Sequence, residues 1–311
     1  MTDPTLHTPI LPDVPEAPNP VTQMLRMLWN DKFAFVSVVI LLIILVCAIT
    51  GPLWLEDIAT KQNLRGRNAP PFDFSTSWPY WLGGDALGRP LLARIIVAAQ
   101  NTIFVAAGAV FFSLTIGTVL GLIAGYTSRI ISQVIMRLAD IVMSFPSLLL
   151  AVIVLYTLDS SVFNLVIVLA ITRIPVYLRT ARAETLEVRE RMFVQAARVM
   201  GASNGRIIFR HILPIVFPTL VTIATLDFAF VMLAESALSF LGIGIQPPEI
   251  TWGLMVSQGR PYLTSAWWLS FWPGIAIILT TLSLNLVSHW LRTALDPAQR
   301  WRLENVRKKN G

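Results

Sequence analysis

The sequence predicts an all-α integral membrane fold with six transmembrane helices. Of its 311 residues, 55% are hydrophobic and only 14% are charged. The mean hydropathy is +0.65, and the apolar residues gather in long runs, which a soluble domain does not show. Uncharged runs lie at 33–55, between Arg94 and Arg129 and, apart from one histidine, between Arg260 and Arg292. Each run reaches the roughly 20 residues that a membrane-spanning helix needs.

The six spans are expected at approximately residues 33–55, 98–126, 134–158, 161–182, 212–236 and 268–292. Asp140 interrupts the third span, and Arg173 and Pro175 interrupt the fourth. The first run is too long for the core of a signal peptide, and no small-residue cleavage site follows it. We therefore expect it to remain in the protein as a span.

Four regions follow along the chain. Residues 1–22 are rich in proline and polar residues, which predicts a disordered cytosolic tail. Residues 23–97 hold the first span and an external loop, 98–292 form the transmembrane core, and 293–311 form a cytosolic C-terminal tail. Within the core, we expect a short cytosolic helix at about 191–206.

Glycines in the second span predict close helix packing. Gly117, Gly121 and Gly125 follow one another at intervals of four residues, and Gly108 precedes them. Small residues at this spacing share one face of a helix and let a neighbouring helix approach closely. The pattern predicts a packed bundle and carries no information about a substrate.

The distribution of basic residues predicts the orientation. With the N-terminus in the cytosol, 18 of the 24 Lys and Arg residues lie inside, and six lie outside. The positive-inside rule favours this arrangement, with both termini cytosolic. The external connections then run over about 56–94 and 239–267. Tryptophans in or beside them are expected to be interfacial anchors: Trp78, Trp81, Trp252, Trp267 and Trp268.

The connection between the fourth and fifth spans has a helical pattern on the cytosolic side. Residues 181–200 are rich in Ala, Glu, Arg and Leu, which are good helix formers. Gly201 suits a left-handed turn that ends this helix, and Ser203 and Asn204 can cap the next one. Pro214 is compatible with a helix start but not with an interior. The sequence thus predicts a short helix joined through a sharp turn to the fifth span.

Two interpretations of this cytosolic helix stay open from the residues alone. Ala196 and Ala197 keep one side of it thin, so that a partner protein can approach and move the helix as a rigid body. Alternatively, it is an amphipathic helix on the membrane surface, with its basic residues facing lipid phosphates.

The sequence lacks the motifs of several kinds of catalytic and nucleotide-binding site. It has no Gly-x-x-x-x-Gly-Lys-Ser/Thr loop for ATP phosphates and no His-Glu-x-x-His or Cys-His grouping. The single cysteine, Cys47, rules out a disulfide within the chain. Paired acids of an intramembrane protease are not expected, since Asp140 is shallow and Asp227 deep. The basic residues flank the spans instead of forming a stripe with aromatics, which argues against nucleic acid. We therefore expect no enzyme activity, metal or cofactor on this chain.

Four polar residues at membrane depth are candidates for lining a translocation pathway: Asp227, Asn285, Asp140 and Glu235. An ionised carboxylate in a bilayer costs about 2.5–3.5 kcal/mol on insertion scales, so each acid requires a reason. The pathway interpretation is favoured for Asp227. Pairing with Arg137, Arg173 or the backbone is favoured for Asp140 and Glu235, and Asn285 equally suits a helix–helix hydrogen bond.

The stretch Gln195-Ala196-Ala197, followed by Gly201 and then by Ile212-Leu213-Pro214, resembles the "EAA" loop of ABC-importer permeases, with Gln195 in place of the usual glutamate. The resemblance implies that an ATPase partner grips this helix through the residues Gln195, Ala196, Ala197, Met200, Gly201, Ala202 and Ser203.

Other motifs resemble the second permease of dipeptide, oligopeptide and nickel importers. Residues 82–89 are similar to the family's Leu-Gly-Thr-Asp-x-Leu-Gly-Arg, with Gly84 replacing threonine and Pro90 replacing a following aspartate. Residues 137–140 and 146–151 resemble the family's third span, and 234–242 and 252–253 resemble its external loop. The last span and its exit match around Pro273-Gly274 and 285–297, and the resemblance covers about residues 25–300.

This resemblance implies a type I ABC-importer transmembrane domain that moves di- or oligopeptides across the bacterial inner membrane. The implied partners are a homologous second permease, two cytosolic ATPases that hold ATP and Mg²⁺, an extracytoplasmic substrate-binding protein and the lipid bilayer. Nickel chelates, glutathione and antimicrobial peptides use the same architecture. A secondary transporter or channel is the alternative, although no internal repeat of the kind such transporters carry is evident; a membrane scaffold is a third class.

Overall fold

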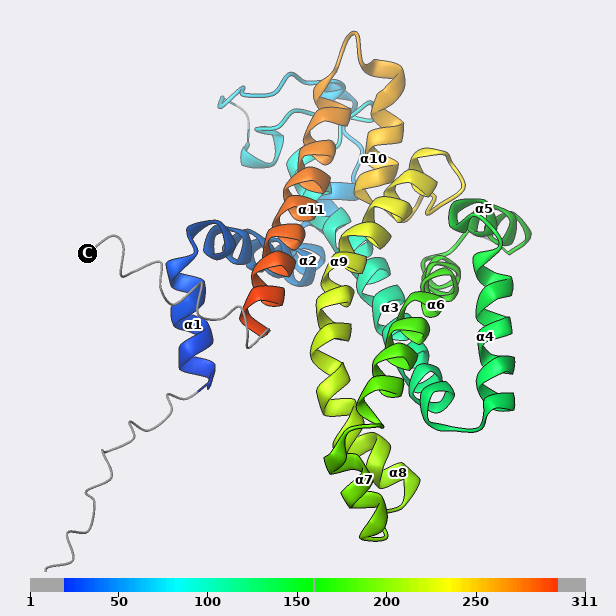
Figure 1. The fold of residues 1–311 in the computed structure, drawn as a ribbon. Helices are drawn as coiled ribbons and strands as arrows, with labels where there is room; N and C mark the ends of the chain where they lie inside the picture. Colours follow the sequence, from blue (N-terminus) through cyan, green and yellow to red (C-terminus); the bar gives the residue numbers. More distant parts are fainter. Residues whose placement is uncertain (1–19, 76, 159, 296–311) are drawn as a thin grey trace, which may run out of the picture.

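The computed structural model describes residues 20–75, 77–158 and 160–295, and within these ranges the regular elements are helices (Figure 1). Five long segments can each cross a membrane by length and composition. They are α2 (Lys32–Thr60), α3 (Leu91–Tyr126), α6 (Val162–Val188), α11 (Trp268–Leu295) and Asn204–Phe240, which contains α9 (Leu213–Phe240). They confirm five of the six predicted spans.

The predicted third span is not one straight helix. It consists of α4 (Arg129–Met143) and α5 (Ser147–Thr157), which meet at an angle of 83°. Pro146 directly precedes α5, and proline disfavours helix in the residue before it. The expected interruptions lie elsewhere and do not break their helices: Asp140 is inside α4 and Pro175 is inside α6. Within the described residues, the candidate spans number six if the bent pair is counted as one.

The glycines of α3 permit its packing against α6, as the sequence predicts. A Cβ on Gly117, Gly121 or Gly125 would lie 2.6 Å from a Cβ of Tyr177, Ala181 or Thr185, respectively. Real Cβ contacts are longer, so only glycine fits. Together the two helices form the most extensive helix pair in the described part of the chain.

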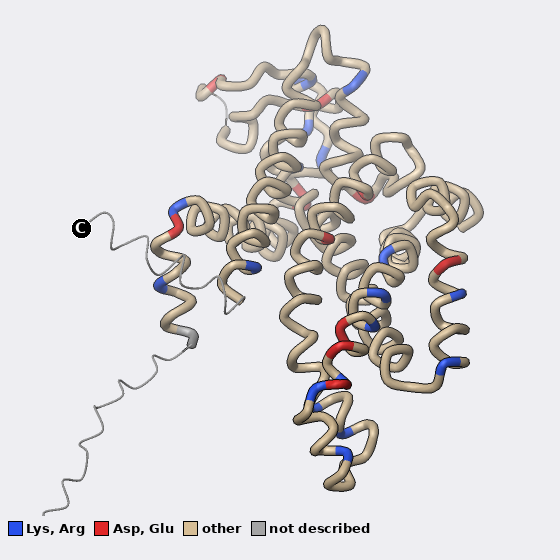
Figure 2. The backbone as a smooth tube through the Cα atoms, in the orientation of Figure 1, with Lys and Arg blue, Asp and Glu red and all other residues tan. Residues whose placement is uncertain are grey.

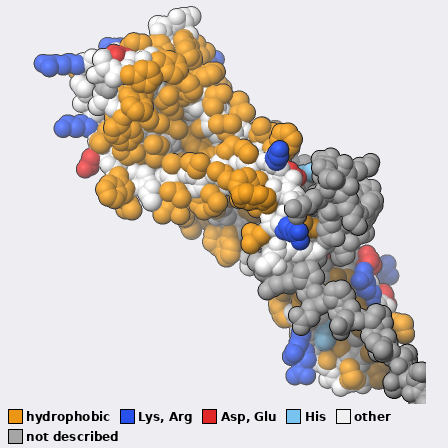
Figure 3. Space-filling view, turned by 90° about the vertical axis from the view of Figure 1, so that its left-hand side faces the viewer, with side chains coloured by type: hydrophobic (Ala, Val, Ile, Leu, Met, Phe, Trp, Pro, Cys, Tyr) orange, Lys and Arg blue, Asp and Glu red, His pale blue; other side chains and the backbone are white. Residues whose placement is uncertain are grey.

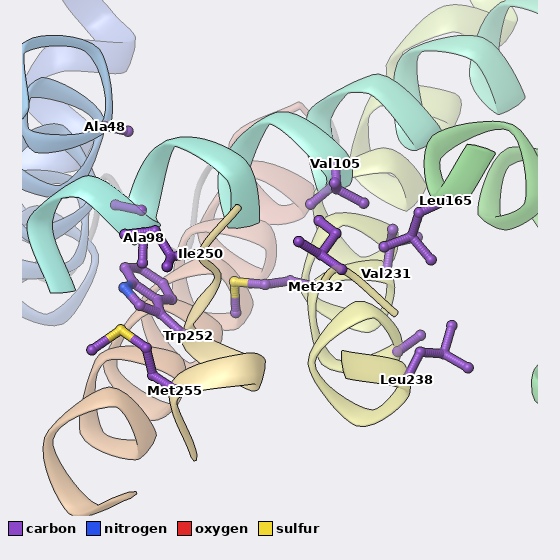
Figure 4. Packing of buried hydrophobic residues seen from close by; sticks show 14 of the residues in the cluster. Ala48, Ala98, Val105, Leu165, Val231, Met232, Leu238, Ile250, Trp252 and Met255 are labelled. Carbon is purple, nitrogen blue, oxygen red and sulfur yellow. The ribbon is translucent and has the colours of Figure 1, made fainter. Parts of the chain in front are cut away.

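A main apolar core lies between α2, α3, α5, α6, α9, α11 and a short helix, α10 (Trp252–Gly259), that the sequence analysis missed (Figure 4). Trp252 is 2% exposed, and its indole N–H donates to the carbonyl of Ile95 at 2.8 Å. The expectation that Trp252 and Trp268 are interfacial anchors is wrong, because both are buried. Trp78, Trp81 and Trp267 are exposed.

The connection between α2 and α3, which the sequence places outside the membrane, folds around one carboxylate. It contains the short helical turns Leu64–Gly66 and Trp78–Tyr80. Oδ1 of Asp85 accepts from the backbone N–H groups of Leu87 and Arg89 at 2.9 and 2.8 Å. Oδ2 accepts from the guanidinium groups of Arg89 and Arg94. Arg94, expected before the second span, lies inside α3 and is 3% exposed.

Both ends of the described chain differ from the predicted tails. An additional helix, α1 (Pro20–Asn30), precedes α2 and contains the last residues of the segment predicted to be disordered at 1–22. Residues 1–19 lie outside the described residues. The predicted C-terminal tail, 293–311, begins inside α11, and 296–311 also lie outside the described part.

Charged residues are distributed unevenly over the fold. Figure 2 shows many of them around the connection between α6 and α9 and on α4, whereas the middle of the bundle carries few. The face that bears α1, α2 and α11 is broadly apolar (Figure 3). This distribution is that of a helix bundle in a bilayer.

Candidate coupling segment and translocation groove

The predicted cytosolic helix is two short helices that project from one end of the bundle (Figure 1). We call residues 192–207 the coupling segment: it comprises α7 (Met192–Val199), a turn, and α8 (Asn204–Ile207). α6 leads into it, and α8 continues through a π-helical turn, Ile208–Ile212, into α9. The coupling segment thus connects two long helices, α6 and α9.

The turn between α7 and α8 is held by backbone hydrogen bonds. Gly201 has φ +82°, the left-handed conformation expected for this position. Its N–H donates to the carbonyl of Arg198, and the N–H of Ala202 donates to the carbonyl of Ala197, both at 3.0 Å. These two bonds define a Schellman motif, which satisfies the last carbonyls of a helix. Ser203 then accepts the backbone N–H of Arg206 through its hydroxyl and begins α8.

The coupling segment has a buried side and an exposed side. Val194, Ala197 and Ile207 are buried, at 0%, 4% and 0% exposure. Val194 and Ile207 belong to an apolar cluster with residues of α3, α6 and α9, against which Ala202 also packs. Three large apolar side chains point the other way: Met192, Val199 and Met200 are 87%, 89% and 81% exposed.

The remaining predicted coupling residues lie on the exposed side or on the turn. Gln195 and Ala196 are exposed, and the Gln195 amide donates to the carbonyl of Glu190 at 3.1 Å. Arg198 lies over the ring of Tyr126, 5.6 Å from its centroid, and Tyr126 also hydrogen-bonds Asn204. The end of α3 therefore contacts both short helices. An apolar exposed side on a firmly anchored segment is typical of a protein-docking surface.

Asp227 has the partner that the pairing interpretation named. Arg173 of α6 donates through Nε to Asp227 Oδ2 at 3.1 Å and through Nη2 to Oδ1. The Arg173 guanidinium also lies 4.4 Å from the centroid of the Phe230 ring. The Asp227 carboxylate is 4% exposed, so the structure shows it as part of an interface between α6 and α9.

The other two acids also have partners. Asp140 pairs with Arg179 at 2.6 Å, which is a different arginine from those expected, and both side chains are exposed by more than two-fifths. Glu235 is fully buried, and its carboxylate accepts from the hydroxyls of Ser239 and Ser236 at 2.8 and 3.3 Å. Neither acid has a partner that the pairing interpretation named (Arg137, Arg173 or the backbone): Asp140 pairs with Arg179, and Glu235 is held by two serine hydroxyls.

Asn285 is the one pathway candidate that lines a large hollow among the described residues. A groove of about 910 Å³ runs between α9 and α11, and we call it the α9–α11 groove. Its polar wall includes Thr219, Thr222, Asn285, Ser288 and His289, with Arg191 and Arg292 also lining it. The four residues predicted for the pathway are thus not gathered into one site.

Sequence reasoning did not select the threonines or Ser288. Their signal was present in the helical spacing: Asn285, Ser288, His289 and Arg292 recur at intervals of three or four and share one face of α11. Among the described residues, no group of His, Cys, Asp or Glu is arranged to hold a metal.

Comparisons with known proteins identify similar chains. Residues 117–301 match the family described as "Binding-protein-dependent transport system inner membrane component". Residues 19–71 match the "N-terminal TM domain of oligopeptide transport permease C". The chain is 37% identical to a dipeptide transport system permease protein of Alkalihalophilus pseudofirmus, with 94% of this chain and 95% of that protein covered.

Two further proteins have similar levels of identity. A di/tripeptide transport system permease protein of Pseudomonas aeruginosa is 36% identical, with 90% of this chain and 93% of that one covered. A probable D,D-dipeptide transport system permease protein of Escherichia coli is also 36% identical, with coverage of 88% and 91%. Among solved structures, the inward-facing MetNI methionine ABC transporter has a TM-score of 0.54 at 16% identity, covering 67% of this chain and 99% of that chain.

Proposed function

Since the chain belongs to the family of binding-protein-dependent transport system inner membrane components, it is a permease subunit of an ABC importer, and we propose that it moves di- and oligopeptides across the bacterial inner membrane. Three relatives that match nearly the whole chain are named as permeases for dipeptides or di/tripeptides. The MetNI structure supports the type I importer fold, and at 16% identity it bears on the fold alone.

The observation that carries the proposed mechanism is the two-sided coupling segment. Its buried side, Val194 and Ile207, is anchored on the membrane helices, while Met192, Val199 and Met200 present an apolar surface to the cytosol. A separate ATPase subunit docks on this exposed surface. Because the segment is continuous with α6 and α9, a displacement of the ATPase moves both helices.

The complete importer has this chain paired with a homologous second permease. Two cytosolic ATPases, which hold ATP and Mg²⁺, dock on the two coupling segments, and an extracytoplasmic binding protein delivers the substrate. ATP drives transport only if it binds the closed ATPase pair more tightly than the open one. Closure brings the coupling segments together and switches the bundle from inward-facing to outward-facing; hydrolysis resets it.

Within this chain, the α9–α11 groove is the wall of the translocation pathway. Its side chains are hydroxyls, one amide, one imidazole and two arginines among apolar residues. The guanidinium groups of Arg191 and Arg292 and the second N–H of the Asn285 amide suit the carbonyl and carboxylate oxygens of a peptide, since they donate hydrogen bonds. The hydroxyls of Thr222 and Ser288 already donate to backbone carbonyls. Asn285 is the predicted pathway residue that this geometry supports.

Site-directed cross-linking tests the docking proposal. Met200→Cys is introduced after Cys47, the one native cysteine, is replaced by alanine, and the full complex is reconstituted in vesicles. We expect a short thiol cross-linker to join residue 200 to the ATPase and to abolish ATP-driven uptake. Tyr156, which is 89% exposed on α5, supplies the control Tyr156→Cys, which should give no ATPase adduct.

Uptake by the same vesicles tests the transport function and the substrate. We expect labelled dipeptides to accumulate only when ATP is present on the side of the membrane where the ATPases lie and when the binding protein is also present. Unlabelled peptides should compete, and nickel ions should not. Accumulation driven by an ion gradient without any ATPase would contradict the proposal and support a secondary transporter.

A further inference from the structure

The additional helix α1 has more apolar surface than the protein covers. With about 100° between successive residues, positions 24, 25, 27, 28 and 29 form one continuous apolar arc, and 22, 26 and 30 form the polar remainder. One part of this arc packs on the end of α11. There, Met27 is 3% exposed and belongs to a small apolar cluster with Ala34, Trp290 and Ala294.

The other part of the arc is open. Leu25 and Trp29 are 61% and 72% exposed and lie one helical turn apart. Phe33, at the start of α2, is 77% exposed, and the Trp29 ring meets the ring of Phe35 edge-on with centroids 4.8 Å apart. The three large side chains form an exposed apolar strip across the junction of α1 and α2.

This strip is continuous with the outer surface of α2. Val36, Val46, Ile49 and Leu53 are each more than half exposed, and they continue the same apolar surface along a segment whose hydropathy is that of a membrane span. Figure 3 shows that this side of the molecule is broadly apolar. The natural cover for a surface that extends without a break from a membrane span is the lipid that covers the span.

The polar side of α1 fits the depth of lipid headgroups. Arg26 and Asn30 are exposed on it, and Lys32 follows at the start of α2. Helices with an apolar side containing Trp and Leu and a basic polar side lie in the plane of the interface, and Trp is enriched at that depth.

We propose that α1 lies in the cytosolic interface of the bilayer, with Leu25, Trp29 and Phe33 inserted among lipid acyl chains. The same helix packs on Trp290 and Ala294 of α11, within two residues of His289 and Arg292, which line the α9–α11 groove. α1 therefore braces one wall of that groove against the membrane surface. This inference does not depend on the substrate or on the ATPase.

Lipid photolabelling tests the inference on the unmodified chain. The whole complex is reconstituted in phosphatidylethanolamine and phosphatidylglycerol vesicles that contain a phospholipid with a diazirine in its acyl chain. After irradiation, we expect mass spectrometry to find lipid adducts on residues 24–30 as well as on α2. Adducts that begin only at α2 would overturn the proposal, because they would place α1 outside the lipid.

Nitroxide labels supply a second, residue-level measurement. On the cysteine-free background, labels are placed at Leu25 and Trp29 and, as matched controls on the same helix, at Arg26 and Asn30. Collision rates with oxygen, relative to a water-soluble nickel chelate, should be several-fold higher at 25 and 29 than at 26 and 30. Equal ratios would place the helix in water. Low collision rates with both reagents at 25 and 29 would mean that a protein covers the strip, and either result overturns the proposal.

Discussion

Arg173 and Asp227 join the two helices that flank the coupling segment. The pair lies 54 positions apart in the sequence and makes two hydrogen bonds at membrane depth. Arg173 belongs to α6, which enters the coupling segment, and Asp227 to α9, which leaves it. The ion pair therefore links α6 directly to α9, in addition to the chain that runs through the coupling segment.

The first prediction concerns this pair. Asp227→Leu should lower the free energy of unfolding in micelles by up to about 3 kcal/mol, because the Arg173 guanidinium, whose side chain is only 19% exposed, loses its partner. The double variant Arg173→Leu, Asp227→Leu should regain most of the loss, since apolar pairs replace buried ion pairs at little cost. Thermal unfolding measures both. If the single variant melts like the wild type, the pair does not stabilise the α6–α9 interface.

A second prediction concerns the turn between α7 and α8 in the coupling segment. A side chain at Gly201 would meet no atom within 4 Å, but φ is +82° there, which costs about 1–2 kcal/mol for a residue with a Cβ. Gly201→Val should leave membrane insertion intact and reduce ATP-driven uptake at least tenfold.

Gly205 is the matched control for that change. It also has open space around it and is not in the left-handed region, so Gly205→Ala should transport normally. Uptake and ATP hydrolysis are measured on both variants in vesicles. Unchanged uptake by Gly201→Val would show that coupling does not require this turn.

The third prediction addresses the contact of α3 with α6. Gly121→Val places a Cβ 2.6 Å from the Cβ of Ala181 and from the carbonyl oxygen of Leu178. Overpacking of this kind costs about 1–3 kcal/mol, so the yield of folded protein and its melting temperature should fall. Gly274→Ala, where nothing lies within 4 Å, should keep both. Equal melting temperatures for the two variants would mean that α3 and α6 are farther apart than the structure shows.

A fourth prediction concerns the external connection. Asp85→Asn removes the charge that holds Arg89 and Arg94, so we expect the loop to loosen. Trypsin should then cleave after the exposed Arg65 and Arg67 several-fold faster than in the wild type. Asp73→Asn, at an exposed carboxylate that accepts from nearby Ser75, is the control and should leave the cleavage rate unchanged. A similar rate for both variants would contradict the central role of Asp85.

Local patterns predicted much of the architecture. The apolar runs, three of them free of Lys, Arg, Asp and Glu, located five spans, and the glycine spacing in α3 identified the surface that packs on α6. Gly201 and Ser203 marked the end of α7 and the start of α8 correctly. These features depend on neighbours within a few residues, whose spacing is written directly in the sequence.

Long-range contacts set the features that were not predicted. A proline does not by itself predict a bend, since Pro175 lies inside the unbroken helix α6. The bend at Pro146 could therefore not be predicted without the packing that sets the directions of α4 and α5. Trp252 is buried because its indole reaches Ile95, a contact across 157 positions. The partner of Asp140 is Arg179 on another helix. Hydropathy and residue spacing do not predict which distant side chains come into contact.

The division of the coupling segment into two sides has a consequence for how such a subunit changes over time. Met192, Val199 and Met200 can be substituted without disturbing the bundle, whereas Val194 and Ile207 are constrained by their neighbours. If an ATPase docks on the exposed side as we propose, new pairings between permeases and ATPases can arise by substitution of the outer residues alone, while the packing on the membrane helices is inherited unchanged.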